Sequence, residues 1–113
     1  MSNNNVPNSS DNQAGDCPAI PSTRPLFTLG RIVATPGALD LLDRTCANAF
    51  DLLLRHQHGD FGSVPPEDAE ENRRSIESGC RVLSSYFLSD ADRLWIITEA
   101  DRSSTTLLLP SEY

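Results

Sequence analysis

The sequence predicts an α+β domain in which two to three helices pack on one face of a four-stranded, mostly antiparallel sheet. The C-terminal third contains three apolar or alternating runs, Cys80 to Leu88, Arg93 to Ala100 and Ser104 to Leu109, separated by short polar segments typical of turns. These runs indicate a three-strand meander. The middle of the chain carries three segments with helix start and stop residues. Before them, Leu26 to Ala34 is an apolar run that supplies the fourth strand.

Residues 1–24 are rich in Asn, Ser and Pro, and contain few apolar side chains to offset the entropy of ordering them. We therefore expect a disordered polar tail at 1–24 and a single folded domain at 25–113. In the first strand, Gly30 marks a bulge or a point where two backbones approach closely.

The first helix is expected to begin with Thr35 as a hydroxyl cap and Pro36 at the first helical position, where no N–H is needed. It is expected to end near Thr45. Its side chains predicted to face inward are Leu39, Leu41 and Leu42.

Two more helices follow. One begins at the capping residue Asn48 and stops at Gly59, with an apolar stripe predicted at Phe50, Leu53 and Leu54. The other, Glu67 to Ser78, opens with a cluster of acidic side chains and closes at Gly79. Because this helix has few apolar residues, we expect it on the surface.

The chain has 113 residues, which is one domain at most, and a net charge of −7, with Arg as its only basic residue besides two His. This acidity argues against binding to nucleic-acid phosphates and suits a basic protein surface as partner. The composition and charge do not determine the oligomeric state.

The three cysteines Cys17, Cys46 and Cys80 are widely spaced and odd in number, which favours reduced thiols over a disulfide framework. The N-terminus lacks the pattern of a signal peptide, and no apolar run is long enough to span a membrane. The sequence therefore predicts a cytoplasmic protein without membrane association.

The histidines His56 and His58 stand two residues apart, so they point to different faces of a helix and cannot hold one metal ion together. We interpret both as helix C-terminal residues stabilised by the helix dipole. A pair between His58 and Asp60 is the functional alternative. The acidic cluster is explained by its place at a helix start, so neither a metal nor another cofactor is predicted.

Trp95 lies in a run whose two faces are both apolar, with Leu94 and Ile96 on one face and Trp95 and Ile97 on the other. This pattern is typical of a central strand covered on both sides. Trp95 is therefore either a core residue or, if its face is open, a contact for a partner.

The segments FTLGRIVATPGALDLL, RHQHGDFG, PEDAEEN, RVLSSY and LWIITEADRSSTTLLLPSEY resemble a family of small uncharacterised proteins carried on bacterial plasmids and integrative elements. The likeness runs from Phe27 to Tyr113. It implies a role in a mobile element but no particular activity.

A helical first half with a histidine, followed by an antiparallel meander, also resembles the barnase- and colicin-type ribonuclease architecture. In those enzymes a general base, a phosphate-binding Arg or Lys and hydroxyl groups act without a metal. The positions to which this resemblance assigns such roles are His56, Arg74, Tyr86, Thr98 and Arg102.

We therefore expect a non-enzymatic binding protein of a mobile element that inhibits a host factor, such as a defence or nucleic-acid-processing complex, in the manner of anti-CRISPR or anti-restriction proteins. A small metal-independent ribonuclease is the alternative. The residues predicted to contact the partner are Asp60, Glu67, Asp68, Glu70, Glu71 and Trp95.

Overall fold

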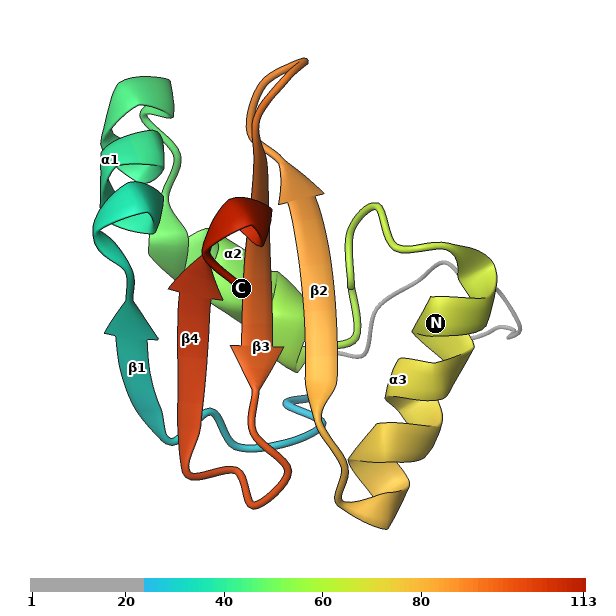
Figure 1. The fold of residues 1–113 in the computed structure, drawn as a ribbon. Coiled ribbons are helices and arrows are strands. Elements are labelled where there is room, and N and C mark those ends of the chain that lie inside the picture. The colour runs from blue at the N-terminus through green and yellow to red at the C-terminus, as the bar shows by residue number, and fades with distance from the viewer. Residues whose placement is uncertain (1–23) are drawn as a thin grey trace, which may run out of the picture.

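A computed structural model describes residues 24–113, which form one four-stranded sheet with three α-helices (Figure 1). The prediction of a disordered tail falls on residues that, apart from Arg24, lie outside the described part. The elements are β1 (Arg31–Ala34), α1 (Pro36–Thr45), α2 (Ala49–Gln57), α3 (Pro66–Ser78), β2 (Val82–Phe87), β3 (Arg93–Thr98), β4 (Ser104–Leu108) and a 3-10 turn, η1 (Pro110–Glu112).

The sheet has the strand order β1-β4-β3-β2. As predicted, β2, β3 and β4 form an antiparallel meander, which pairs Val82 with Thr98 and Trp95 with Leu108. The first strand pairs with the last in parallel, with Arg31 opposite Ser104. The α+β class is therefore confirmed, with a sheet that is mixed because the chain crosses over between β1 and β4.

The helices α1 and α2 cover one face of the sheet, which we call the inner face, and η1 lies on the opposite, outer face (Figure 1). Leu94 and Ile96 of β3 and Leu107 of β4 point to the inner face, where they pack with helix side chains. The helix residues of this core are Ala38, Leu41, Leu42, Leu52 and Leu53.

Two of the three helices thus pack on one face, within the predicted two to three. The third, α3, lies on the surface, as its composition predicts. It runs along the free edge of β2 (Figure 1). The physical reason is its polar composition. Its buried side chains are Asn72 and Ser75, which seek hydrogen bonds rather than an apolar core.

Local signals for the helix ends are confirmed. Thr35 accepts a hydrogen bond from the N–H of Ala38, and the Asn48 side chain accepts from Phe50 and Asp51. Gly79 ends α3 in the left-handed conformation, as its position predicts.

The first strand begins at Arg31 rather than Leu26, because Gly30 has φ +67° and interrupts the extended backbone. A Cβ atom on Gly30 would lie 2.4 Å from the carbonyl oxygen of Ser103. Gly30 is therefore the point of close approach that the sequence indicates, and it places the start of β1 against the turn before β4.

Three predicted inward side chains are exposed instead: Leu39 by 58%, Phe50 by 66% and Leu54 by 38%. In α2 the inner stripe is formed by Leu52, Leu53 and His56. Three successive leucines do not show which side of the helix faces inward, and the predicted stripe leaves out His56. Within residues 24–113, no helix is long and apolar enough to cross a membrane.

Candidate functional site

His56 is a residue of α2 whose side chain is wholly buried against the inner face, where it bridges β2 and β3. Its Nδ1 atom is 2.6 Å from the hydroxyl of Ser84 on β2, and its Nε2 atom is 2.9 Å from the hydroxyl of Thr98 on β3. Thr98 is 2.7 Å from Thr105 on β4, whose hydroxyl donates to the carbonyl oxygen of Leu29 at 2.7 Å. A hydrogen-bonded chain thus crosses the inner face from β2 to the segment before β1.

The last bond fixes the direction of the others. Because Thr105 donates its only hydroxyl proton to Leu29, it accepts from Thr98, and Thr98 in turn accepts from His56 Nε2. Neutral imidazole has one N–H, so Nδ1 accepts the proton of Ser84. The chain therefore defines the Nε2–H tautomer of a neutral His56.

The surroundings of His56 keep it neutral. Burial lowers the pKa of His56 to about 3, and the positive charge of Arg102 acts in the same direction. The ring of Phe27 packs edge-on against the imidazole, with 5.1 Å between ring centroids. His56 is thus a structural residue of the inner face. It lies in the last turn of α2, as expected, but its side chain also links β2 to β3, which the expectation of a helix C-terminal residue leaves out.

Of the five ribonuclease-like positions, the structure brings His56 into direct contact with Thr98 only. Tyr86 is buried and donates to the backbone carbonyl of Asp60 at 2.6 Å. Arg74 is exposed on α3 and pairs with Glu71 at 3.2 Å. These groups do not surround a common space at which an RNA phosphate could meet them.

Arg102 is also engaged by the backbone. It has φ +61° and donates to the carbonyl oxygens of Ser75 at 3.0 Å and Glu99 at 3.0 Å. It also donates to Cys80 at 2.6 Å. A cation at these carbonyls neutralises the negative end of α3 and fastens that helix to the turn between β3 and β4.

The residues predicted to contact a partner fall into two groups. Glu67, Asp68, Glu70 and Glu71 are exposed on α3. Arg73 and Arg74 pair with Glu70 and Glu71 one turn away. Glu67 and Asp68 make no ion pair within residues 24–113, so the start of α3 presents net negative charge to solvent. We call the four exposed acids of α3 the acidic surface.

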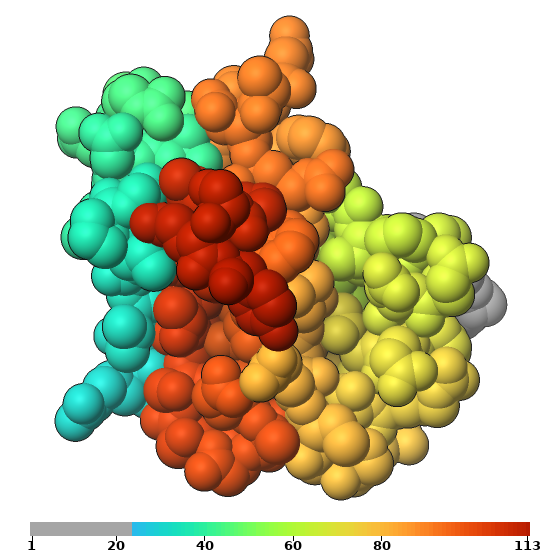
Figure 2. Space-filling model, viewed as in Figure 1, coloured from blue at the N-terminus to red at the C-terminus, as the bar shows by residue number. Residues whose placement is uncertain are grey.

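Asp60 and Trp95 lie outside this helix. Asp60 pairs with Arg55 at 2.7 Å and accepts from the N–H of Gly62, so it shapes the loop before α3. Trp95 is half-buried on the outer face, where it contacts the ring of Tyr113 at 5.6 Å. Figure 2 shows the C-terminal end and α3 on the same side of the molecule.

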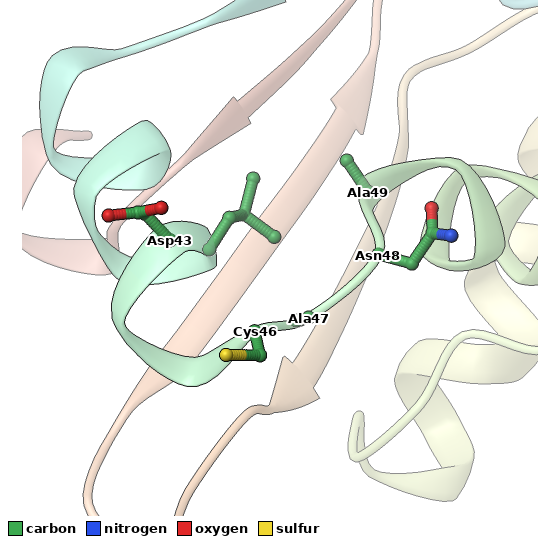
Figure 3. Close-up of a pocket in the computed structure, with 6 residues that line it drawn as sticks. Asp43, Cys46, Ala47, Asn48 and Ala49 are labelled. Carbon is green, nitrogen blue, oxygen red and sulfur yellow. The ribbon is translucent and has the colours of Figure 1, made fainter.

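A shallow hollow lies between the end of α1 and the start of α2 (Figure 3). It is lined by Leu42, Asp43, Cys46, Ala47, Asn48 and Ala49. These residues include one carboxylate and one thiol and no basic side chain, so they offer no base beside the thiol. Within the described part of the chain, no three His, Cys, Asp or Glu residues are grouped so as to hold a metal ion.

Sequence reasoning missed the link through His56 and the role of Asn72. From the sequence, Ser84, Thr98 and Thr105 are hydroxyl residues that could line one face of the sheet and are interpreted as ordinary outer-face residues, whereas the structure buries all three on the inner face. A signal for the first was present, because Ser84, Thr98 and Thr105 share the strand parity of the apolar inner residues. Polar side chains at predicted core positions of three strands require a common partner, and a buried histidine can supply it.

Comparisons of the chain with protein-family models, with curated proteins and with solved structures each give no match.

Proposed function

We propose that the protein is a non-enzymatic binding protein that uses the acidic surface of α3 to cover a basic surface of another protein. The observation that carries this proposal is the exposed acid cluster Glu67, Asp68, Glu70 and Glu71 on a helix fastened at its opposite side. Six acidic and two basic side chains lie between Gly59 and Ser78, within a protein whose net charge is −7.

The attachment of α3 supports its use as a binding element. Asn72 and Ser75 hold the helix to β2 and to Arg102, so its exposed side chains are presented by a fixed backbone. Pre-organised charges lose less conformational entropy on binding than charges in a flexible segment. They also raise the rate at which an oppositely charged partner associates.

A basic surface that binds nucleic acid is the kind of partner that such a helix would imitate, because a row of carboxylates resembles a row of phosphates in charge. We extend the proposal to a host defence or nucleic-acid-processing complex as target, and this part rests on the resemblance of the sequence to plasmid-borne proteins alone. The ribonuclease alternative lacks comparable support, since a general base must reach the substrate and His56 is closed off from solvent.

The test is affinity capture from a host extract with three forms of the protein. The first is the wild type, and the second carries Glu67→Gln, Glu70→Gln and Glu71→Gln. The third carries Asp43→Asn, Asp51→Asn and Asp90→Asn, which removes as many charges from exposed positions elsewhere.

We expect the wild type and the Asn variant to retain the same basic protein, identified by mass spectrometry, and the Gln variant to lose it. Equal retention by all three forms would refute the acidic surface as the contact. Cleavage of RNA by the wild type in EDTA, absent in a His56→Gln variant that remains folded, would contradict the proposal by revealing an enzyme.

A further inference from the structure

The two edges of the sheet differ in how they are closed. Along the β2 edge, the Asn72 amide donates to the carbonyl oxygen of Leu83 at 2.6 Å and accepts from its N–H at 3.1 Å. The next outward-facing residue, Ser85, is paired with the loop through Phe61 and Ser63 at 3.0 and 2.6 Å. Leu83 and Ser85 are therefore satisfied within the described residues, which leaves only Phe87, at the end of β2, outside this cover.

The β1 edge has no such cover from the described residues. Arg31 donates its N–H to Ser103, just before β4, and Thr35 donates to Leu107 of β4. The alternate residues Ile32 and Ala34 therefore direct their N–H and C=O groups away from the sheet. The exposed fractions of the flanking apolar side chains are 45% for Ile32 and 41% for Val33. Edge strands usually carry a charge, a proline or a bulge that prevents pairing. Here Gly30, Arg31 and Pro36 stand at the two ends of the strand, and the residues between them, Ile32 to Ala34, carry no such feature.

We propose that β1 is a homodimer interface, at which a second copy of this chain adds its own β1 in antiparallel orientation to form a continuous eight-stranded sheet. Only outward-facing residues can exchange hydrogen bonds, and Gly30 is excluded because its φ of +67° is not extended. The remaining register pairs Ile32 with Ala34 of the second copy. It places Val33 opposite its own equivalent on the two-fold axis.

This register is also complementary in charge. Arg31 lies opposite Thr35 of the second copy, on the outer face. The Thr35 hydroxyl donates to the carboxylate of Glu112, which also accepts from the N–H of Gly37. Arg31 makes no ion pair within residues 24–113. In the dimer, the guanidinium of each copy would lie near Glu112 of the other copy, which gives two equivalent ion pairs. No like charges face each other at the two-fold axis.

The edge is only four residues long, so the dimer is expected to be weak and concentration-dependent. In sedimentation equilibrium between about 10 µM and 1 mM, we expect the average mass to rise from that of the 12.4 kDa chain towards twice this value. Val33→Asp, which places two carboxylates at the axis, should abolish this rise. The control Leu39→Asp, at an exposed apolar position on α1, should leave it unchanged.

Cross-linking tests the register. In a chain with Cys17, Cys46 and Cys80 replaced by Ser, Val33→Cys should form a disulfide-linked dimer on mild oxidation, because non-hydrogen-bonded partners have Cα atoms about 4.5 Å apart. Thr106→Cys, one strand inward on the same face, should not. Circular dichroism establishes that each variant is folded.

Two results would overturn the proposal. One is a monomer at 1 mM together with equal, low cross-linking of the two cysteine variants. The other is slow hydrogen exchange at Ile32 and Ala34 that does not depend on concentration, since this would mean that a segment of the same chain covers the edge. Neither measurement involves the partner of α3, so the dimer and the proposed function are tested separately.

Discussion

The hydrogen-bonded network through His56 joins three strands by side chains and ends at the backbone carbonyl oxygen of Leu29, before β1. Ser84 donates at one end of this network and the Leu29 carbonyl oxygen accepts at the other, while His56, Thr98 and Thr105 each donate and accept, so all the bonds run in one direction. A buried polar network of this kind stabilises the fold only while every member is paired.

Removing one residue from this network should therefore lower the free energy of unfolding by more than the contribution of a single hydrogen bond. Thr105→Val removes the donor to the Leu29 carbonyl oxygen and the acceptor for the Thr98 hydroxyl proton. We expect the free energy of unfolding to fall by about 1–3 kcal/mol. Thr106→Val, its neighbour on the outer face, should change stability by less than about 0.5 kcal/mol. Urea denaturation of both variants measures the difference in unfolding free energy. Equal unfolding free energies would mean that the hydrogen-bonded network does not stabilise the fold beyond an ordinary surface residue.

The state of His56 predicts how stability depends on pH. Its pKa is lowered from 6.5 to about 3 on folding, so between these values the unfolded chain binds the proton and the folded chain does not. The stabilisation is fully present above pH 6.5 and is lost as the pH falls, by up to about 1.4 kcal/mol per pH unit. Denaturation at pH 7, 6 and 5 should show this slope. The His56→Gln variant should be less stable at pH 7, and its unfolding free energy should depend less steeply on pH than that of the wild type. If both proteins show the same pH dependence, other titratable groups cause it.

At the scale of elements, α3 is joined to the sheet by polar contacts in place of an apolar core. The Asn72 side-chain amide bonds to the N–H and C=O of Leu83, as the backbone of a neighbouring strand would do. Arg102 donates to the carbonyl oxygen of Ser75 near the C-terminal end of the helix. Ala69 and Ile76 add a small apolar contact with the cluster around Phe61. This explains how a helix with two polar buried side chains stays in place.

We expect Asn72→Ala to destabilise the protein by about 1–3 kcal/mol, because it leaves the N–H and C=O of Leu83 without partners. Arg73→Ala, on the exposed side of the same helix, is the control and should have little effect. Hydrogen exchange at Leu83 should accelerate in the Asn72 variant alone. Unchanged exchange there would show that the amide does not close the β2 edge.

At the scale of the whole molecule, the strand order places β1 at one end of the sheet and α3 beside the other end. A dimer through β1 would therefore carry its two acidic surfaces at opposite ends. This arrangement suits a partner that presents two basic sites, and it depends on both the proposed function and the proposed dimer.

The sequence predicted those parts of the fold that depend on neighbouring residues. The caps Thr35, Asn48 and Gly79 and the meander follow from local backbone chemistry, and all are present. The parallel pairing of β1 with β4 joins residues about seventy positions apart, for which no local pattern exists. The same holds for the contacts of His56 and Asn72.

The candidate site divides in the same way. The acids of α3 could be predicted to be exposed, because carboxylates at a helix start need no partner. The burial of His56 could not, since a histidine at the end of a helix is compatible with either side until the strands that pair with it are known. The contact of Trp95 with Tyr113 likewise depends on where the C-terminus folds back.

The most direct test of the central claim is the association rate constant for the captured basic partner, measured by stopped flow at several salt concentrations. If the acidic surface guides binding, the wild-type rate falls as salt rises, and the Glu67, Glu70 and Glu71→Gln variant associates about tenfold more slowly at low salt with a shallower dependence. The Asp43, Asp51 and Asp90→Asn variant, with the same net charge, should follow the wild type. Coinciding curves for the two variants would contradict the claim, because net charge alone would then account for the rate.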